Sequence, residues 1–360
     1  MNQHYVPRVY LKNFATKKKD EFYVNVYDKQ SSNNFTTNIK NICSENNLYT
    51  LNKNDHFNPL IIEEAYAKYF EPLYETAYKL LVDDNIIEIS DEERAIILVA
   101  IFQFYFRNTK ILNESISFHR KRIELLFYKN KLAGQAVYKY IDHDFDTNKD
   151  LEQQQIQFEN ESKYSFKKEH IDNYTELALK NSWQSISIYK ICDESKFITC
   201  DDPLKNLNLE KNSKNPFQIS SQFFLPLNEK YCLFLHNDRT KTYNKVYRED
   251  VYNGRAFMIN SNSIENSQRF AIGDQSAIND TLRLENLINT EYENNIDKLM
   301  ELVAQSYPIL KAQGASKEHL EVNKKYLDLY KCQGTLTDTQ KKDFLREAID
   351  QQKQYWIKKL

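Results

Sequence analysis

The sequence predicts an α+β protein that is mainly helical, with a helical core, a small antiparallel sheet and a helical C-terminal extension. Only 5 Gly and 7 Pro occur among 360 residues, too few for a turn-dense sandwich or barrel or for glycine-rich nucleotide loops. Several long segments repeat apolar residues at spacings of three and four, as amphipathic helices do. Only short runs are rich in β-branched and aromatic residues, so strands should be few.

Cysteine usage and the N-terminus indicate a cytoplasmic protein. The 5 cysteines are odd in number, far apart and without a C-x-x-C pair, so they fit neither a disulfide framework nor a zinc ribbon. The N-terminus has no apolar stretch of the kind that a secretory signal needs. The longest apolar run, residues 95–106, is interrupted by Gln103 and is shorter than the roughly 20 residues that span a bilayer. We therefore expect a buried helix there and no membrane contact.

The first elements are two extended segments and a helix. Residues 21–28 combine β-branched and aromatic residues between polar ones and predict a strand, and residues 48–51 predict a second short extended piece. Residues 60–82 repeat apolar side chains every three or four positions and predict an amphipathic helix. Pro72 should kink this helix, because a proline removes a backbone donor and crowds the preceding turn.

The next predicted helix has recognisable ends. Ser90 and Glu93 form an S-x-x-E capping box, which predicts a helix start. From there the helix runs through the apolar stretch to Arg107 and, after a break within residues 108–113, continues towards Gly134. Because glycine commonly terminates helices, Gly134 predicts the end.

The remaining chain is predicted as helices around a small sheet. Residues 142–168 are polar and weakly periodic, so we interpret them as a solvated connection or an exposed helix and as the preferred internal joint. There follow a helix at 169–192, a strand at 197–200, a hairpin at 223–235, a helix at 248–270 and charged helices from 276 onward. Pro226 should confine its strand to a sheet edge. One sheet should gather the early strand, the 197–200 strand and the hairpin, giving a core at 1–275 and an extension at 276–360.

The N-terminal segment carries the first candidate functional residues. His4 lies beside Gln3, and Arg8 follows four residues later among bulky apolar side chains that can anchor the segment in a core. A fixed imidazole is what a general base or a metal ligand needs. The alternative is that His4 and Arg8 only hydrogen-bond the backbone of a docked terminus.

Two predicted helices supply further candidates. Glu64 and Glu71 are seven residues apart, two turns along one helix face and about 10 Å from each other, so they could frame a site with a third group. The alternative is a solvated face on which Glu64 and Lys68 form an i,i+4 pair. Gln103 and Arg107 share one face of an apolar helix, where the buried amide needs partners. The guanidinium suits either a phosphate or the helix C-terminus.

Two aspartates mark the end of a predicted strand. Asp201 and Asp202 follow it directly, and Pro203 fixes the turn after them. Carboxylates at a strand end often hold hard cations or act as general bases. The alternative is an Asx-type turn in which one aspartate bonds backbone and the other is hydrated.

Charge gives little support to nucleic-acid binding by the whole chain. The net charge is −2, so such binding would need a local patch. The basic run at residues 119–122 lies on a predicted helix with acidic neighbours, and we interpret it as a charged surface rather than as a nucleic-acid site.

Familiar catalytic motifs are absent, but one string is distinctive. The chain has no P-loop, G-x-G-x-x-G, H-E-x-x-H or G-x-S-x-G motif, so the mechanisms that those motifs imply receive no support. Residues 3–14 read QHYVPRVYLKNF, and this string resembles the N-terminal hallmark of the bacterial family catalogued as domain of unknown function 4238. Later features in the same order are Glu64 and Glu71, Gln103 and Arg107, F-x-T-x-D-x-P at 197–203, and Asn260 before Arg269 and Phe270. The resemblance covers about residues 1–275.

The resemblance implies positions rather than a mechanism, because the family is uncharacterised. It implies that the matching polar residues converge in space: His4, Glu64, Glu71, Gln103, Arg107 and Asp201. The family's aspartate falls on Asp201, and Asp202 stands where the family often has Asn. This departure places an additional carboxylate beside the one that matches.

Our functional hypothesis from these residues is a metal-assisted phosphodiester hydrolase, a nuclease-like effector that would suit bacterial defence against phage. In it, His4, Glu64 and Asp201 hold a divalent metal ion. His4, Asp201 and Glu71 activate water, while Arg107 and Arg8 neutralise phosphate charge. The remaining residues of a substrate-binding or structural polar cluster would be Gln3, Gln103, Asp202 and Asn260. Nucleic acid is the expected partner.

The rival hypothesis is a non-enzymatic sensor or partner-binding protein of a bacterial defence or stress system. In this case the same polar cluster is a structural lock. The C-terminal helices form the interface to a protein partner or to a second copy of the chain. The aromatic share of 13% suits such an interface, because Tyr and Trp are common anchors there.

Overall fold

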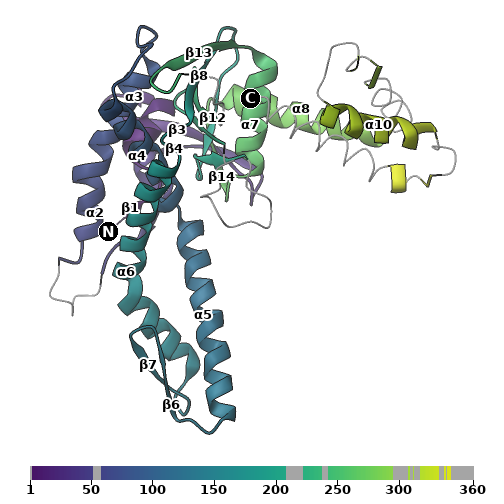
Figure 1. Ribbon diagram of the computed structural model, residues 1–360. Coiled ribbons are helices and arrows are strands. Elements are labelled where there is room, and N and C mark those ends of the chain that lie inside the picture. The colour runs from purple at the N-terminus through teal and green to yellow at the C-terminus, as the bar shows by residue number, and fades with distance from the viewer. Residues whose placement is uncertain are drawn as a thin grey trace. The chain divides into compact units, whose positions relative to one another are not determined.

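The computed structural model describes residues 2–51, 58–207, 222–236, 242–294, 307–308, 311, 317–331, 336–337 and 339–341. It divides the chain into two compact units, Met1–Ile278 and Asn279–Leu360. The first unit mixes helices with several small sheets, in line with the α+β prediction, and holds all the candidate site residues (Figure 1). The only long helix described entirely within the second unit is α10 (Lys317–Lys331).

Helices account for more of the described residues than strands do. The α-helices of the first unit are α1 (Arg8–Leu11), α2 (Ile61–Ala65), α3 (Glu71–Val82), α4 (Asp91–Arg107), α5 (Thr109–Leu132), α6 (Leu151–Lys180) and α7 (Asn253–Glu265), and α8 (Gln275–Asn294) leads out of it. Two short 3-10 turns, η1 (Lys12–Phe14) and η2 (Ile39–Asn41), accompany the N-terminal segment. The segment η3 (Tyr66–Phe70) is a π-helical turn between α2 and α3.

The strands form two five-stranded sheets and two two-stranded pairs. The first sheet runs β2 (Thr16–Lys18), β3 (Glu21–Asp28), β14 (Phe270–Gly273), β9 (Thr199–Cys200), with β4 (Asn33–Asn38) also on β3. The second runs β10 (Lys205–Asn206), β11 (Phe223–Pro226), β12 (Tyr231–His236), β8 (Ser185–Ile191), β13 (Val246–Val251). The pairs are β1 (Asn2–His4) with β5 (Ser44–Asn46), and β6 (Val137–Tyr140) with β7 (His143–Asp146). Only β13 and β8 are paired in parallel among them.

The prediction of one sheet is wrong. The early strand β3 and strand β9 do share a sheet, through β14. The hairpin β11–β12 belongs to the other sheet, because β12 pairs along its whole length with β8. Residues 185–191 were expected to end a helix at 169–192, but their sequence SISIYKI is rich in β-branched residues and forms an inner strand of that second sheet, between β12 and β13.

Three other predicted elements differ from the structure. Residues 142–168 are not a solvated connection, because β7 and the first half of α6 occupy them. The alternative of a helix is confirmed for α6, which is exposed at many positions but buries Phe158 and Phe166. The predicted helix at 248–270 is shorter, since β13 and β14 flank α7. Residues 48–51 form no strand, because the Tyr49 amide donates to a side chain, that of Gln3, instead of to a neighbouring strand.

The predicted helix ends are confirmed. Ser90 and Glu93 form the capping box of α4. The direction changes by 50° between α4 and α5 at Asn108, whose side chain caps α5. Gly134, with φ of +70°, ends α5, and the Gln135 amide reaches back to the Asn130 carbonyl, as in a Schellman motif.

The hairpin at 223–235 is also confirmed, but Pro226 does not lie in an edge strand. Strand β11 lies between β10 and β12, and β10 pairs only with Phe223 and Phe224. The backbone nitrogen of Pro226, which carries no hydrogen to donate, therefore faces no neighbouring strand. For this reason an inner strand can end on a proline.

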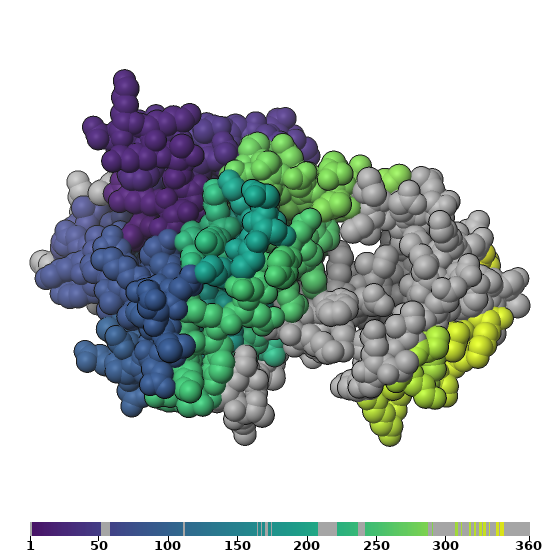
Figure 2. All heavy atoms as spheres, turned by 90° about the horizontal axis from the view of Figure 1, so that it is seen from above, coloured from purple at the N-terminus to yellow at the C-terminus, as the bar shows by residue number. Residues whose placement is uncertain are grey.

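The N-terminal segment is part of the core that joins the two sheets. Its Val6, Tyr10, Leu11 and Phe14 are buried in the larger hydrophobic cluster. The Tyr10 hydroxyl lies 2.5 Å from Thr199 Oγ1 in β9 and donates to the Pro226 carbonyl in β11 at 2.8 Å. Figure 2 shows the purple N-terminal residues against the teal and green residues of the second half of this unit. The distinctive string thus holds the two sheets together.

A long helical arm leaves this core. Helix α5 and the first half of α6 extend side by side from the rest of the unit, with the β6–β7 hairpin beside them (Figure 1). A second hydrophobic cluster fills the arm and its base, and includes Ile123, Phe127, Phe145 and Phe158.

Candidate functional site

The buried guanidinium of Arg107 organises the N-terminal candidates. Its Nε donates to the His4 carbonyl at 2.9 Å, and its terminal nitrogens lie 3.4 and 3.5 Å from Glu71 Oε1. The guanidinium stacks 4.3 Å from the ring centroid of Tyr66. Burial opposes its charge, but the oxygens of Tyr49, Tyr66 and the nearby glutamates outweigh burial and raise the pKa of Arg107. The residue is therefore a fixed cation inside the fold.

The π-helical turn η3 decides which glutamates face Arg107. An α-helical turn takes 3.6 residues, so positions seven apart share a face, whereas a π turn takes in one more residue. With η3 between them, Glu63 and Glu71 share a face at a spacing of eight, and both act on the charge of Arg107. Glu64, the predicted partner of Glu71, is exposed and accepts a hydrogen bond from Asn58 at 2.7 Å. The expected pairing of Glu64 with Glu71 is therefore wrong.

Glu63 is the residue that sequence reasoning missed. Burial raises the pKa of Glu63, the neighbouring Glu71 raises it further, and the charges of Arg107 and Arg8 oppose these effects. Its Oε2 is buried and has no hydrogen-bond partner among the described residues. The only hint in the sequence is Pro72, which lies at the start of α3 and withholds the amide that a continuous α-helix would use.

The His4 side chain serves the backbone. Its Nε2 lies 3.1 Å from the Ile39 carbonyl. Burial lowers the pKa of His4 to about 4, with the cations Arg8 and Arg107 lowering it further, so the imidazole is neutral near pH 7. Gln3 is fully buried, and its Oε1 accepts from the Tyr49 amide at 2.6 Å. The alternative of backbone hydrogen bonds at a docked terminus thus describes the contact that His4 makes.

A groove of about 420 Å³ runs beside this cluster. Charged residues dominate its walls: Arg8, Lys12, Asp20, Glu21, Lys40, Glu71 and Glu75. Two of the cations are engaged, since Lys40 pairs with Glu21 at 3.2 Å and Lys12 lies 5.4 Å from the Phe22 ring centroid. The exposed Arg8 side chain contacts no described residue by a hydrogen bond or an ion pair. Arg8 is thus the cation available to a ligand.

Gln103 supports the same region from α4. Its Nε2 donates to the carbonyls of Ala100 at 2.9 Å and of Phe70, the last residue of η3, at 3.3 Å. Its Oε1 is buried without a partner among the described residues. Gln103 therefore ties the π turn to α4.

Asp201 belongs to a second cluster at the start of β14. Its Oδ1 accepts from the Gln268 amide at 2.8 Å, and its Oδ2 accepts from the amides of Arg269 and Phe270 at 2.7 and 2.9 Å. Burial raises the pKa of Asp201, while these three hydrogen bonds act in the opposite direction. The N-terminal segment approaches Asp201 through Tyr5, whose pKa is raised by burial and then by Cys43 and Asp201.

The other two candidates of this region also bond within the fold. Asp202 pairs with the buried Lys205 at 3.2 Å, and Lys205 donates to the Asn266 carbonyl at 2.8 Å. Asn260 accepts from the Ile198 amide at 2.9 Å and donates to the Lys196 carbonyl at 2.8 Å. Both residues hold the loops around β9.

The predicted metal ligands do not fit a metal site. The His4 ring bonds Ile39, Glu64 is exposed on α2, and Asp201 is occupied by three backbone amides. Over the described ranges there is no group of three or more His, Cys, Asp or Glu placed to hold a metal ion. We therefore derive no chemical step through a metal.

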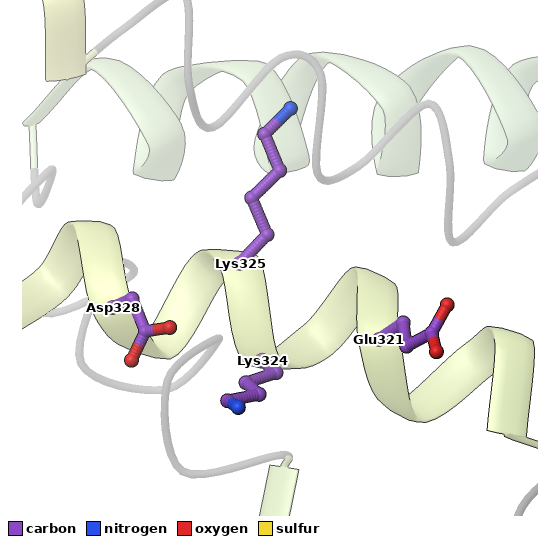
Figure 3. A pocket seen from close by; sticks show the side chains of 4 residues that line it. All are labelled: Glu321, Lys324, Lys325 and Asp328. Atoms are coloured by element: carbon purple, nitrogen blue, oxygen red, sulfur yellow. The ribbon is translucent and has the colours of Figure 1, made fainter.

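A second hollow lies on α10 and lacks such chemistry. It measures about 550 Å³ and is bordered by Glu321, Lys324, Lys325 and Asp328, all on α10. Figure 3 shows the two lysines pointing to different sides of this helix. These exposed side chains do not converge on a ligand, so the groove beside Arg107 is the candidate site.

A comparison with models of known protein families shows to which family the chain belongs. The model of the family described as Protein of unknown function (DUF4238) matches residues 2–277. The chain belongs to this family. The DUF4238 match ends one residue before the boundary of the first compact unit at Ile278, so the family corresponds to that unit. Neither the curated proteins nor the solved structures provide a match to the chain.

Two further findings concern membranes and cysteines. In the part of the DUF4238 chain that the structure describes, no individual helix has the length and apolar character to cross a membrane, and only the bent pair α4 and α5 together meets that criterion. Cys43, Cys192, Cys200 and Cys232 are free thiols, while Cys332 lies outside the described residues.

Proposed function

We propose that this DUF4238 protein is a phosphodiester hydrolase in which Glu63 and Glu71 act as an acid–base pair at the groove beside Arg107. The observation that carries the proposal is the unequal environment of the two carboxyl groups. Glu63 has a raised pKa and an unpartnered buried oxygen, whereas Glu71 is ion-paired with Arg107. Paired carboxyl groups held in different environments are the usual arrangement for acid–base catalysis.

The two glutamates then have distinct roles. Glu71 lines the groove as a carboxylate and accepts the proton of the attacking hydroxyl or water. Glu63 lies one helical turn before Ala67, which also lines the groove, and donates a proton to the leaving oxygen. Arg107 orients Glu71 through their ion pair, because its own position is fixed by the His4 carbonyl.

The substrate class follows from the free cation. Arg8 stands at the groove with no partner in the described structure, and its charge reaches Glu63. A guanidinium binds phosphate oxygens in a bidentate manner and neutralises the charge that develops in phosphoryl transfer. A phosphate ester at this groove would meet Arg8 and Glu71, with Glu63 behind Ala67 in the groove wall. An effector role in bacterial defence against phage forms part of this proposal.

Hydrolysis assays with a matched pair of variants test it. The purified chain is assayed on single-stranded RNA, single-stranded DNA and bis(p-nitrophenyl) phosphate. We expect Glu63→Gln to lower kcat about 100-fold or more, the usual contribution of a general acid. Glu64→Gln, one residue away but exposed, should keep the wild-type rate. The proposal fails if no substrate is cleaved, or if the two variants behave alike while both remain folded.

A cellular assay gives an independent readout. If the hydrolase acts on host nucleic acid, expression should slow growth of the host, and Glu63→Gln should relieve the effect while Glu64→Gln should not. Equal growth of wild type and both variants at equal expression would contradict an effector role.

The non-enzymatic alternative rests on a different observation. The polar side chains of His4, Asp201 and Asn260 all bond backbone groups, as a structural lock requires. If substitution of these residues prevents folding and Glu63→Gln leaves function intact, a sensor or partner-binding protein is the better description.

A further inference from the structure

Helix α5 has two apolar faces, of which only one is buried. Leu112, Ile123 and Phe127 pack into the second hydrophobic cluster. On the outer face, Phe118, Leu125, Tyr128 and Leu132 recur at spacings of seven, three and four, with exposed fractions of 64%, 59%, 53% and 90%. Residues at these spacings form one stripe along a helix. A water-soluble fold gains nothing from such a stripe unless a ligand covers it.

The same face is rich in cations. Lys110, Lys121, Arg122 and Lys129 are all exposed on α5. Against them stand only Glu114 and Glu124 on this helix. The interpretation of residues 119–122 as a solvated charged surface covers only part of this pattern, because the cations alternate with the exposed aromatic side chains.

A groove of about 400 Å³ lies at the base of the stripe. Lys110 and Lys121 line its two ends, about 16 Å apart along the helix axis, and Phe118 lies between them. The amide side chains of Asn113 and Gln268 also face it, and Gln268 is held in place by Asn108 and Thr109. The groove thus combines two lysines with one carboxylate, that of Glu114, an exposed aromatic ring and two amides.

We propose that this face of α5 binds a single strand of nucleic acid. The lysines contact successive phosphates, while Phe118 and Tyr128 stack on bases, the combination by which proteins hold single strands. The proposal rests on the proposed hydrolase function, for which it supplies a substrate-binding surface outside the catalytic groove. A duplex fits less well, since paired bases present no free face for stacking.

A partner helix is the less favoured occupant. In such packing the central positions of the stripe become desolvated, and Lys121 lies between Phe118 and Leu125 in its middle. Burying that lysine without a partner would be costly. With nucleic acid, the same lysine contacts a phosphate.

Fluorescence anisotropy measures the binding directly. The full chain carrying Glu63→Gln, which should slow cleavage, is titrated into fluorescein-labelled 12-nucleotide oligo-U and oligo-dT. We expect saturable binding that weakens with salt, by about 0.7 in log–log slope for each phosphate contact. Phe118→Ala and Tyr128→Ala should each weaken binding about 10-fold or more. Tyr252→Ala removes a similarly exposed tyrosine outside α5 and should leave binding unchanged.

Two results would overturn the inference. One is the absence of oligonucleotide binding, and if wild-type protein still cleaves bis(p-nitrophenyl) phosphate, the proposed hydrolase function stands without this surface. The other is unchanged binding in Phe118→Ala together with a dimer that Leu125→Asp dissociates, which would make the face a helix–helix interface. Conversely, binding that depends on Phe118 in a protein that cleaves no phosphodiester would support the surface and contradict the hydrolase.

Discussion

Glu63 and Glu71 both act on the guanidinium of Arg107, although a spacing of eight residues would set them about 80° apart around a regular α-helix. The π-helical turn between them makes up the difference. Turns of this kind occur often at functional sites, because the inserted residue rotates one half of a helix against the other. The proposed acid–base pair therefore exists only while this turn is kept.

Replacing Arg107 by lysine should destabilise the fold. A lysine keeps the charge but has neither the flat face that stacks on Tyr66 nor the fork that reaches both the His4 carbonyl and Glu71. We expect a loss of about 2–4 kcal/mol in the free energy of unfolding, measured by urea denaturation. Arg8→Lys, at an exposed position of the same groove, is the control and should change stability little. Equal curves for the two variants would show that the buried contacts of Arg107 carry little energy.

Replacing Asp201 should destabilise the fold more than replacing the neighbouring Asp202. In the wild-type protein the Asp201 carboxylate accepts hydrogen bonds from backbone amides, and Asp201→Asn places an amide donor against them. We therefore expect the free energy of unfolding to fall by about 3 kcal/mol or more. Asp202→Asn keeps an oxygen near Lys205 and should cost less, about 1–2 kcal/mol. Thermal unfolding of both variants measures the difference, and the reverse order would make Asp202 the structural residue.

Acid should weaken the fold through His4. The pKa of His4 lies at about 4 in the folded protein, below the ordinary value of 6.5, so the unfolded chain binds more protons between these values. The contribution of His4 is full above pH 6.5 and is lost as pH falls towards 4, by at most about 3 kcal/mol. His4→Gln, whose amide can still donate to Ile39, should flatten this part of the profile. Urea denaturation at pH 7, 6, 5 and 4 measures the free energy of unfolding of both proteins. If it falls equally with pH in the two, His4 does not cause the loss of stability in acid.

Gln103→Met distinguishes a structural from a ligand-binding amide. Methionine has a similar shape and removes both the bond to Phe70 and the buried oxygen that lacks a partner. These effects oppose each other, so the stability change should stay within about 1 kcal/mol. If Gln103 only supports the π turn, hydrolysis should also persist. A folded variant with no activity would instead place the free oxygen in contact with substrate.

Local sequence signals were sufficient to predict helices whose ends are marked by a capping residue or by glycine. The capping box at Ser90, the break at Asn108 and the stop at Gly134 all concern hydrogen bonds within a few residues, so nothing distant can change them. The family membership, in contrast, rests on a family model that matches residues 2–277 and not on one short string. The strand at residues 185–191 was missed because its neighbours, β12 and β13, are supplied from far along the chain.

The site was predicted in part. Arg107, Glu71, His4 and Arg8 do come together, and Asp201 lies in a separate cluster whose donors are backbone amides, which side-chain patterns do not reveal. The choice of Glu64 over Glu63 failed because it assumed a uniform 3.6-residue period. Pro72 signalled an irregularity but not its kind, since a proline can be accommodated by a kink or by a π turn.

The pairing of β3 with β14 sets the order of events during synthesis. Val26 pairs with Ile272, so about 250 residues must leave the ribosome before the first sheet can close. At the usual rates of translation this takes roughly 12–50 s, during which the first of the two sheets that anchor the N-terminal string is incomplete. The apolar residues that later join the sheets are exposed for that time. The first sheet is therefore completed only when nearly all of the DUF4238 unit has been synthesised.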